Sequence, residues 1–162
     1  MSRGKVDAKS LAAFLLSVNQ NLEVAYANSL ARYYVEESDL EGVSHDIAFV
    51  QMCLETGFLR FGGLVTADMN NFCGLGSIGP EKRGEIFETP QLGVRAHIQH
   101  LKGYATDEPL RGTLVDPRYR YIRYGSAPTI SDLAGRWASD KEYGNKLGAL
   151  LKRLYDFAYP FS

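Results

Sequence analysis

Apolar residues recur every three or four positions along most of the chain, which is the spacing of a helix with one buried face. Asp7 can cap a first helix and Asn21 a second, because short polar side chains accept a hydrogen bond from the first helical turn. The apolar faces of these two predicted helices are Leu11, Phe14, Leu15 and Val18, then Leu22, Tyr26, Leu30 and Tyr33.

A third predicted helix is apolar on nearly every side. Ser44 opens it and Gly57 is expected to end it. The segment between them, HDIAFVQMCLET, carries apolar residues at most positions. A helix of this kind belongs in the middle of a domain rather than on its surface. The sequence therefore predicts that residues 44–57 form the central helix.

The helical pattern breaks between Phe58 and Glu88. Glycines interrupt this stretch at positions 62, 63, 74, 76, 79 and 84. No helical period is sustained, so we predict long loops with one short irregular hairpin. Loops of this length in a compact domain are often functional.

Helical signals return at Thr89, a hydroxyl cap that is followed by a proline at the first helical position. A short helix is expected near residues 131–137. Ser139 and Glu142 are then expected to form the capping box of a final helix. The apolar faces of the two longer helices are Val94, Ile98, Leu101 and Ala105, then Tyr143, Leu147, Leu150 and Leu154.

Composition indicates one globular domain spanning residues 1–162, with 45% hydrophobic and 23% charged residues. The net charge of −1 argues against a nucleic-acid partner, because phosphate binding normally needs a basic surplus. No apolar run approaches the roughly 20 residues of a membrane-spanning helix, so no span is expected. The polar start MSRGKVDAKS lacks the apolar stretch of a secretory signal, which leaves either an internal protein or a trimmed leader.

Glu55 stands out because it ends the most apolar helix. Low dielectric and the negative end of the helix dipole both disfavour a carboxylate, so the pKa of Glu55 is expected to rise. A raised pKa suits a general acid in glycoside cleavage. Phe58, Leu59 and Phe61 are placed to wall this acid from water. The alternative is a glutamate that points into solvent or pairs with Arg60.

Four segments together resemble a known family. They are DIAFVQMCLETGFLRFGG (46–63), NNFCGLG (70–76), GVRAHIQHLKGYA (93–105) and DLAGRWASDKEYGNKLGALLKRLY (132–155). In this order they resemble the bacterial glucosaminidases of glycoside hydrolase family 73, which hydrolyse peptidoglycan, over about residues 14–155. The resemblance implies a lysozyme-like all-α fold (α+β at most) with a short glycine-rich inserted lobe at about 58–88. It also implies cleavage after N-acetylglucosamine, with Glu55 matching the catalytic acid and Tyr143 the site tyrosine.

Many members of that family carry a second acidic residue on a β-hairpin of the inserted lobe, which is short here. Glu81, Glu85 and Glu88 are the candidates. We predict Glu85, because the segment GEIF approaches the next helix as the hairpin strand of the family does. A surface glutamate without a role is the alternative for each of the three.

Further polar and aromatic residues are predicted to contact the sugar. Amides can orient an acetamide or shape a turn, and aromatic rings can stack on sugars or close the core. Arginines that alternate with the tyrosines at 118–124 could bind lactyl or peptide carboxylates. The predicted substrate contacts are Asn70, Asn71, Phe72, Tyr119, Tyr121 and Trp137.

No metal or cofactor is expected. His97 and His100 lie three residues apart on a helix, but no acidic or cysteine partner accompanies them at ligand spacing. Cys53 and Cys73 are too few for a disulfide scaffold, and a free thiol is expected at each. We expect a monomer that acts on peptidoglycan strands in the cell envelope or after secretion.

Three other functions stay open at this point. A lytic transglycosylase also uses one glutamate but releases an anhydro sugar. A chitin or N-glycan endo-glucosaminidase would use the same N-acetylglucosamine subsite. A non-catalytic glycan-binding module is the alternative outside the enzymes, and Glu55 argues against it because a binding module needs no such acid.

Overall fold

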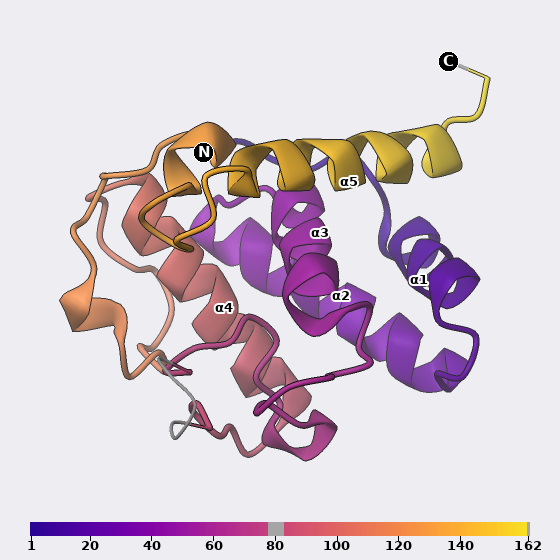
Figure 1. The fold of residues 1–162 in the computed structure, drawn as a ribbon, viewed down its shortest axis with the longest axis horizontal. Coiled ribbons are helices and arrows are strands. Elements are labelled where there is room, and N and C mark those ends of the chain that lie inside the picture. Colours follow the sequence, from indigo (N-terminus) through magenta and orange to yellow (C-terminus); the bar gives the residue numbers. More distant parts are fainter. Residues whose placement is uncertain (78–82, 162) are drawn as a thin grey trace.

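The computed structural model describes residues 1–77 and 83–161 (Figure 1). Within these ranges the chain is helical and has no strand, which confirms the predicted all-α fold class. The α-helices are α1 (Ala8–Val18), α2 (Val24–Glu41), α3 (His45–Thr56), α4 (Pro90–Ala105) and α5 (Tyr143–Ala158). The short 3₁₀ helices are η1 (Ala67–Met69), η2 (Tyr119–Tyr121) and η3 (Ile130–Leu133).

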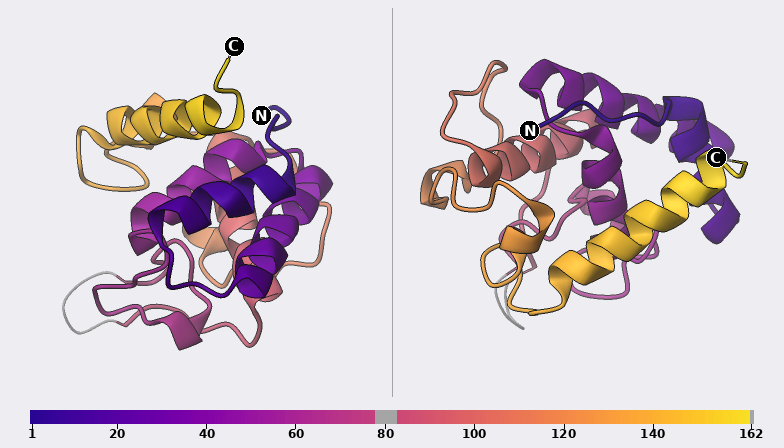
Figure 2. Two further views of the ribbon diagram at one scale, coloured as in Figure 1. Left: turned by 90° about the vertical axis from the view of Figure 1, so that its right-hand side faces the viewer. Right: turned by 90° about the horizontal axis from the view of Figure 1, so that it is seen from above.

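Helix α3 is the centre of the fold, as its apolar sequence predicts. It packs against α2, α4 and α5. In Figure 1 and in the left view of Figure 2, α5 lies at the top of the molecule and the described loops that follow α3 lie at the bottom. Ser44 caps the helix by accepting a hydrogen bond from the Ile47 amide, and Gly57 ends it. The fully buried side chains of α3 include Ala48, Phe49, Met52 and Cys53.

Two predicted caps are wrong. Helix α2 begins after Glu23, while Asn21 lies before it in a turn where its amide donates to Asn19 Oδ1. Helix α5 begins after Glu142, so Ser139 lies too early to cap it. The amide of Glu142 instead donates to Asp140 Oδ1 at 2.9 Å. The short helix expected at 131–137 is the 3₁₀ turn η3, which starts and ends earlier.

The glycine-rich lobe is organised by one amide side chain rather than by the hairpin that we predicted. Asn71 is fully buried, and its Oδ1 accepts hydrogen bonds from the amides of Leu75 at 3.0 Å and Cys73 at 3.4 Å. Its Nδ2 donates to the carbonyls of Leu75 at 2.9 Å and Glu85 at 3.1 Å. Asn71 therefore ties two separate parts of the lobe together.

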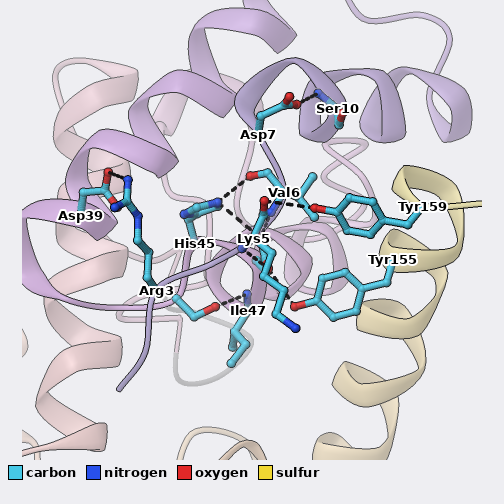
Figure 3. Close-up of polar contacts among 12 residues, drawn as sticks. Arg3, Lys5, Val6, Asp7, Ser10, Asp39, His45, Ile47, Tyr155 and Tyr159 are labelled. Atoms are coloured by element: carbon cyan, nitrogen blue, oxygen red, sulfur yellow. Dashed lines mark hydrogen bonds and ion pairs between the residues drawn. The ribbon is translucent and has the colours of Figure 1, made fainter. Parts of the chain in front are cut away.

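The N-terminal segment is held against α3 and α5 (Figure 3). The buried carboxylate of Asp46, at the start of α3, accepts hydrogen bonds from the amides of Lys5 at 2.8 Å and Val6 at 3.1 Å. It also accepts from the Tyr155 hydroxyl of α5 at 2.8 Å. One carboxylate thus joins three segments at the N-terminal end of the central helix. Every helix in the described part of the chain is too short or too polar to cross a membrane.

A buried ion pair fixes the segment that follows α4. Lys102 of α4 and Glu41 of α2 are almost fully buried, with 2.8 Å between Nζ and Oε1. The Glu41 carboxylate also accepts hydrogen bonds from the amides of Arg111 at 2.9 Å and Gly112 at 2.8 Å. Glu41 therefore holds residues 111–112 against α2 and α4. Lys102 supplies the positive charge that this buried carboxylate needs.

We predict that Lys102→Met destabilises the protein by about 3–5 kcal/mol, because it leaves a buried carboxylate without its counter-ion. Urea denaturation measures the loss. Lys152→Met is the matched control, since Lys152 pairs with Asp156 on the exposed face of α5. That change should cost less than about 1 kcal/mol. Equal losses in the two variants would contradict this role for the buried pair.

Candidate active site

Glu55 lies in the last turn of α3, where its side chain borders a pocket of about 250 Å³. The residue is solvent-exposed, so the prediction that the following segment shields it from water is wrong. Phe58 and Leu59 turn into the core, and Phe61 lines the pocket. The pocket is lined by Glu55, Thr56, Phe61, Gly62, Gly63, Leu64, Val65, Asn71, Gly74 and Ser77.

The carboxylate of Glu55 is held by a tyrosine from the far end of the sequence. Tyr143, the first residue of α5, donates a hydrogen bond from its hydroxyl to Glu55 Oε1 at 2.7 Å. Tyr143 is only 4% exposed, so its hydroxyl approaches Glu55 from the protein interior. The structure thus brings together two residues that lie 88 positions apart in the chain.

A buried chain of hydrogen bonds continues behind Tyr143. Gln51 Nε2 donates to the Tyr143 hydroxyl at 3.0 Å, and His97 Nε2 lies 2.8 Å from Gln51 Oε1. His97 Nδ1 lies 2.7 Å from the Tyr34 hydroxyl. Tyr34, Gln51 and His97 are all fully buried.

Each link of this chain has one consistent direction. Because Tyr143 donates to Glu55, its oxygen accepts from the amide nitrogen of Gln51, which leaves the Gln51 oxygen facing His97. His97 then carries its proton on Nε2, and Nδ1 accepts from Tyr34. Burial lowers the pKa of His97 to about 3, so the ring is neutral and has one N–H to donate. Every donor in the chain therefore points toward Glu55.

The pKa of Glu55 is raised above its ordinary value. Desolvation by the surrounding protein is the largest cause, and hydrogen bonds from Tyr143 and Trp137 to the carboxylate oppose it. Burial and the Glu55 charge raise the pKa of Tyr143 in turn, so its hydroxyl keeps its proton and stays a donor. The arrangement favours a Glu55 carboxyl that can hold a proton at higher pH than an ordinary glutamate.

The second oxygen of Glu55 faces the glycine-rich lobe. A Cβ atom built on Gly74 would lie 3.8 Å from Glu55 Oε2, and the φ of Gly74 is +70°. The neighbouring Cys73 thiol has a pKa well above its usual value, because of burial first and the Glu55 charge second. Cys53 and Cys73 are both free and buried. No group of three or more metal-ligating side chains gathers anywhere in the described residues.

Glu85 does not line the Glu55 pocket. It is half-buried in the lobe, where a Cβ atom built on Gly76 would come within 3.1 Å of Glu85 Cγ. Glu88 is exposed and does not line the pocket either, and Glu81 lies outside the described residues. Among the described residues that line this pocket, Glu55 is the only acidic one. A role for Glu85 as second carboxylate therefore stays a prediction.

The asparagines and the phenylalanine of the lobe serve its structure. The hydrogen-bonding groups of the Asn71 side chain are used on the lobe backbone, and Asn70 adopts a positive φ while it donates to the Phe87 carbonyl at 3.0 Å. Phe72 is fully buried in the core, so its predicted stacking on substrate is wrong. Asn71 does line the pocket, but its side chain shapes the wall.

A second pocket of about 290 Å³ adjoins the first, since Gly74 and Ser77 line both. Of the predicted aromatic contacts, Tyr121 and Trp137 line it, and Tyr121 is 64% exposed. Tyr119 does not line it and stacks on Tyr124, with 5.0 Å between the ring centroids. The lining is Cys73, Gly74, Leu75, Gly76, Ser77, His100, Tyr104, Arg118, Tyr121, Ile122, Arg136 and Trp137.

Sequence reasoning missed the buried chain behind Tyr143 and most of the second pocket. Gln51 carried a signal, because it is a polar residue in the middle of an apolar helix. His97 was considered only as a metal ligand, which overlooks its buried contact with Gln51. His100, Tyr104 and Arg136 line the second pocket, and this can be seen only when the segments around α4 are placed together.

Comparisons with known proteins identify a family, a sequence relative and a structure with a shared fold. The sequence pattern of the family Glucosaminidase, described as mannosyl-glycoprotein endo-beta-N-acetylglucosaminidase, matches residues 31–156. An uncharacterized protein of Borreliella burgdorferi (strain B31) is 43% identical over 157 residues, which are 97% of this chain and 77% of that protein. A crystal structure of S. aureus autolysin E in complex with the muropeptide NAM-L-Ala-D-iGlu matches with a TM-score of 0.60 at 13% identity. That match covers 96% of this chain and 69% of the autolysin chain, and it shows a shared fold.

We predict that Tyr143→Phe raises the pKa of Glu55 further. The lost hydrogen bond stabilises the ionised carboxylate, so its removal lets the protonated form persist to higher pH. NMR titration of the glutamate side-chain carboxyl carbons measures the shift. The variant should also lose about 1–3 kcal/mol of stability, because the Gln51 amide is left without its acceptor.

Tyr155→Phe is the control for this titration. It removes a tyrosine hydroxyl of the same helix that donates to Asp46, at the opposite end of α3 from Glu55. The pKa of Glu55 should stay as in the unmodified protein. An unchanged or lower Glu55 pKa in Tyr143→Phe would show that the Tyr143 bond does not control this carboxyl.

Proposed function

Because the chain belongs to the glucosaminidase family, we propose that it hydrolyses the β-1,4 bond that follows N-acetylglucosamine in peptidoglycan, with Glu55 as general acid. Members of such a family are glycoside hydrolases, and the muropeptide bound to autolysin E is a peptidoglycan fragment. We also propose that the protein acts where peptidoglycan lies, in the cell envelope or outside the cell.

The observation that carries the proposal is the environment of Glu55. A general acid must be protonated before the reaction and must reach the leaving oxygen. Desolvation raises the pKa of Glu55, and its side chain is open to solvent in a pocket. Substrate can therefore approach a carboxyl that holds its proton more tightly than an ordinary glutamate does.

Tyr143 and Trp137 suit the second half of such a reaction. As Glu55 gives its proton to the glycosidic oxygen, it becomes a carboxylate. The hydrogen bond from Tyr143 stabilises that ionised form, and Trp137 favours it as well. Tyr143 does so without moving, because it is already held by Gln51.

Two routes can stabilise the positive charge that develops on the sugar. A second carboxylate such as Glu85 can hold a water molecule or act as nucleophile, or the acetamide of the substrate can act as nucleophile. Glu85 lies outside the described lining of the Glu55 pocket, and this favours the acetamide. We propose the substrate-assisted route, with Glu85 as the alternative.

We predict that Glu55→Gln abolishes release of glycan fragments from purified sacculi while the protein stays folded. Loss of the proton donor should reduce turnover by at least about 10²–10⁴-fold. Mass spectrometry of the released fragments measures turnover, and circular dichroism checks the fold. Glu88→Gln, an exposed glutamate outside the pocket, is the matched control and should keep full activity. Full turnover by a folded Glu55→Gln protein would reject Glu55 as the acid.

The same digest identifies the bond. After borohydride reduction, glucosaminitol at the new ends supports cleavage after N-acetylglucosamine. Muramitol would indicate a muramidase, and an anhydro end that resists reduction would indicate a lytic transglycosylase. Glycan binding without any release of fragments by the unmodified protein would indicate a binding module.

We predict that Glu85→Ala keeps activity within about threefold of the unmodified enzyme, because the acetamide takes the place of a second carboxylate. Initial rates on sacculi measure this. A loss comparable to that of Glu55→Gln, in a variant that melts at the normal temperature, would instead assign the second carboxylate to Glu85.

A further inference from the structure

The two adjoining pockets differ in charge. In the described lining of the Glu55 pocket, Glu55 is the one ionisable side chain apart from hydroxyl groups, and glycines form much of the wall. The second pocket contains the guanidinium groups of Arg118 and Arg136 and no carboxylate in its described lining. We call the first the neutral pocket, because its described lining is uncharged apart from Glu55 itself, and the second the cationic pocket.

Neither arginine of the second pocket forms an ion pair with a carboxylate in the described part of the chain, although the Arg136 charge is the smallest of the causes that lower the pKa of Asp132, after its hydrogen bonds with Thr129. Arg118 lies over the Tyr121 ring, with its guanidinium carbon 5.2 Å from the centroid. Arg136 donates to the backbone carbonyl of Asp132 at 3.1 Å. By contrast, Lys102 and Arg95 each form an ion pair with a buried glutamate.

The nearby carboxylates are already occupied. Asp116 is buried and accepts hydrogen bonds from His100 Nδ1 at 2.7 Å and from the backbone amide of Arg118 at 2.9 Å. Asp132 accepts from the amide and hydroxyl of Thr129 at 3.1 and 2.7 Å. The guanidinium groups of Arg118 and Arg136 are thus left to bind an anionic group that enters the pocket.

We propose that this second pocket binds the carboxylate carried by the muramyl residue of a glycan strand, through Arg118 and Arg136. This rests on the proposed function and adds which sugar each of the two pockets binds. N-acetylglucosamine is uncharged and suits the neutral pocket, whereas the muramyl unit bears a carboxylate on its lactyl group or on an attached peptide. A planar guanidinium can bind a carboxylate with two parallel hydrogen bonds.

The two pockets meet beside the proposed acid. Gly74 and Ser77 line both pockets, and Glu55 lines the first. With N-acetylglucosamine in the first pocket and the muramyl unit on its reducing side in the second, the bond after N-acetylglucosamine lies beside Glu55. Tyr104, Tyr121 and Trp137 supply apolar surface for the muramyl ring.

Binding in a Glu55→Gln background tests the proposal without depending on turnover. The probes are soluble peptide-free glycan strands, peptide-bearing strands, and each of these after its carboxylates are converted to amides. Isothermal titration gives the dissociation constants. Amidation should weaken binding about tenfold or more, because each charge-assisted hydrogen bond to the arginines is lost. Arg118→Gln and Arg136→Gln should each weaken binding of the charged strands by a similar factor.

The amidation effect is the loss of affinity when the carboxylates of a strand are converted to amides. It should disappear in the double variant Arg118→Gln, Arg136→Gln, and this is the decisive result. Arg32→Gln is the matched control, because Arg32 is an exposed arginine of α2 outside the pocket, and it should keep the full effect. An effect confined to peptide-free strands assigns the lactyl carboxylate, and one confined to peptide-bearing strands assigns a peptide carboxylate. A persisting effect in the double variant, or none in the Glu55→Gln parent, overturns the proposal.

Failure of this proposal is distinguishable from failure of the proposed function. If unmodified protein releases fragments from sacculi but the amidation effect does not depend on the two arginines, the enzyme assignment stands and the cationic pocket has no such role. If charged strands bind through the arginines and no fragments are released, the carboxylate pocket stands and the hydrolase assignment falls.

Discussion

The hydrogen bond from Tyr143 to Glu55 is the interaction on which the rest of the site depends. It joins the first residue of α5 to the last turn of α3, and Gln51, His97 and Tyr34 extend it into α4 and α2. All the groups behind Glu55 are buried, so a broken link would leave a polar group unsatisfied at a cost of about 1–3 kcal/mol. The packing of four helices and the orientation of one carboxyl are therefore set by the same bonds.

This arrangement balances two opposing effects on Glu55. Desolvation favours the protonated form, while Tyr143 and Trp137 favour the carboxylate. An acid held by donors alone would be fully ionised, and one in an apolar pocket alone would give up its proton with difficulty. Because Glu55 is open to solvent on one side, a bound sugar would replace water there and increase the desolvation. The protonated form is thus favoured most when substrate is present.

The central helix and the residues Glu55 and Tyr143 could be identified from sequence, because a fully apolar helix and a segment resemblance are properties of continuous stretches. The caps of α2 and α5 were misplaced, since several polar residues lie near each helix start and the folded geometry selects among them. Phe72 was predicted to contact substrate because aromatic rings can stack on sugars, yet it fills the core. The contact of His97 with Gln51 spans 46 positions and has no local pattern to reveal it.

The distance between the glycine-rich lobe and α4 is set by backbone atoms rather than by side chains. Gly93 of α4 lies so close to Asn70 that an added Cβ atom would come within 1.8 Å of the Asn70 carbonyl oxygen. The lobe can therefore rest directly on α4, and Asn71 then fixes the turn that carries Gly74 to Glu55 Oε2. A larger residue at position 93 would push the whole lobe outward, and the neutral and cationic pockets that meet at Gly74 would separate. The two pockets and the acid beside them consequently depend on the close contact of Gly93 with the Asn70 carbonyl, which lies outside the lining of both pockets.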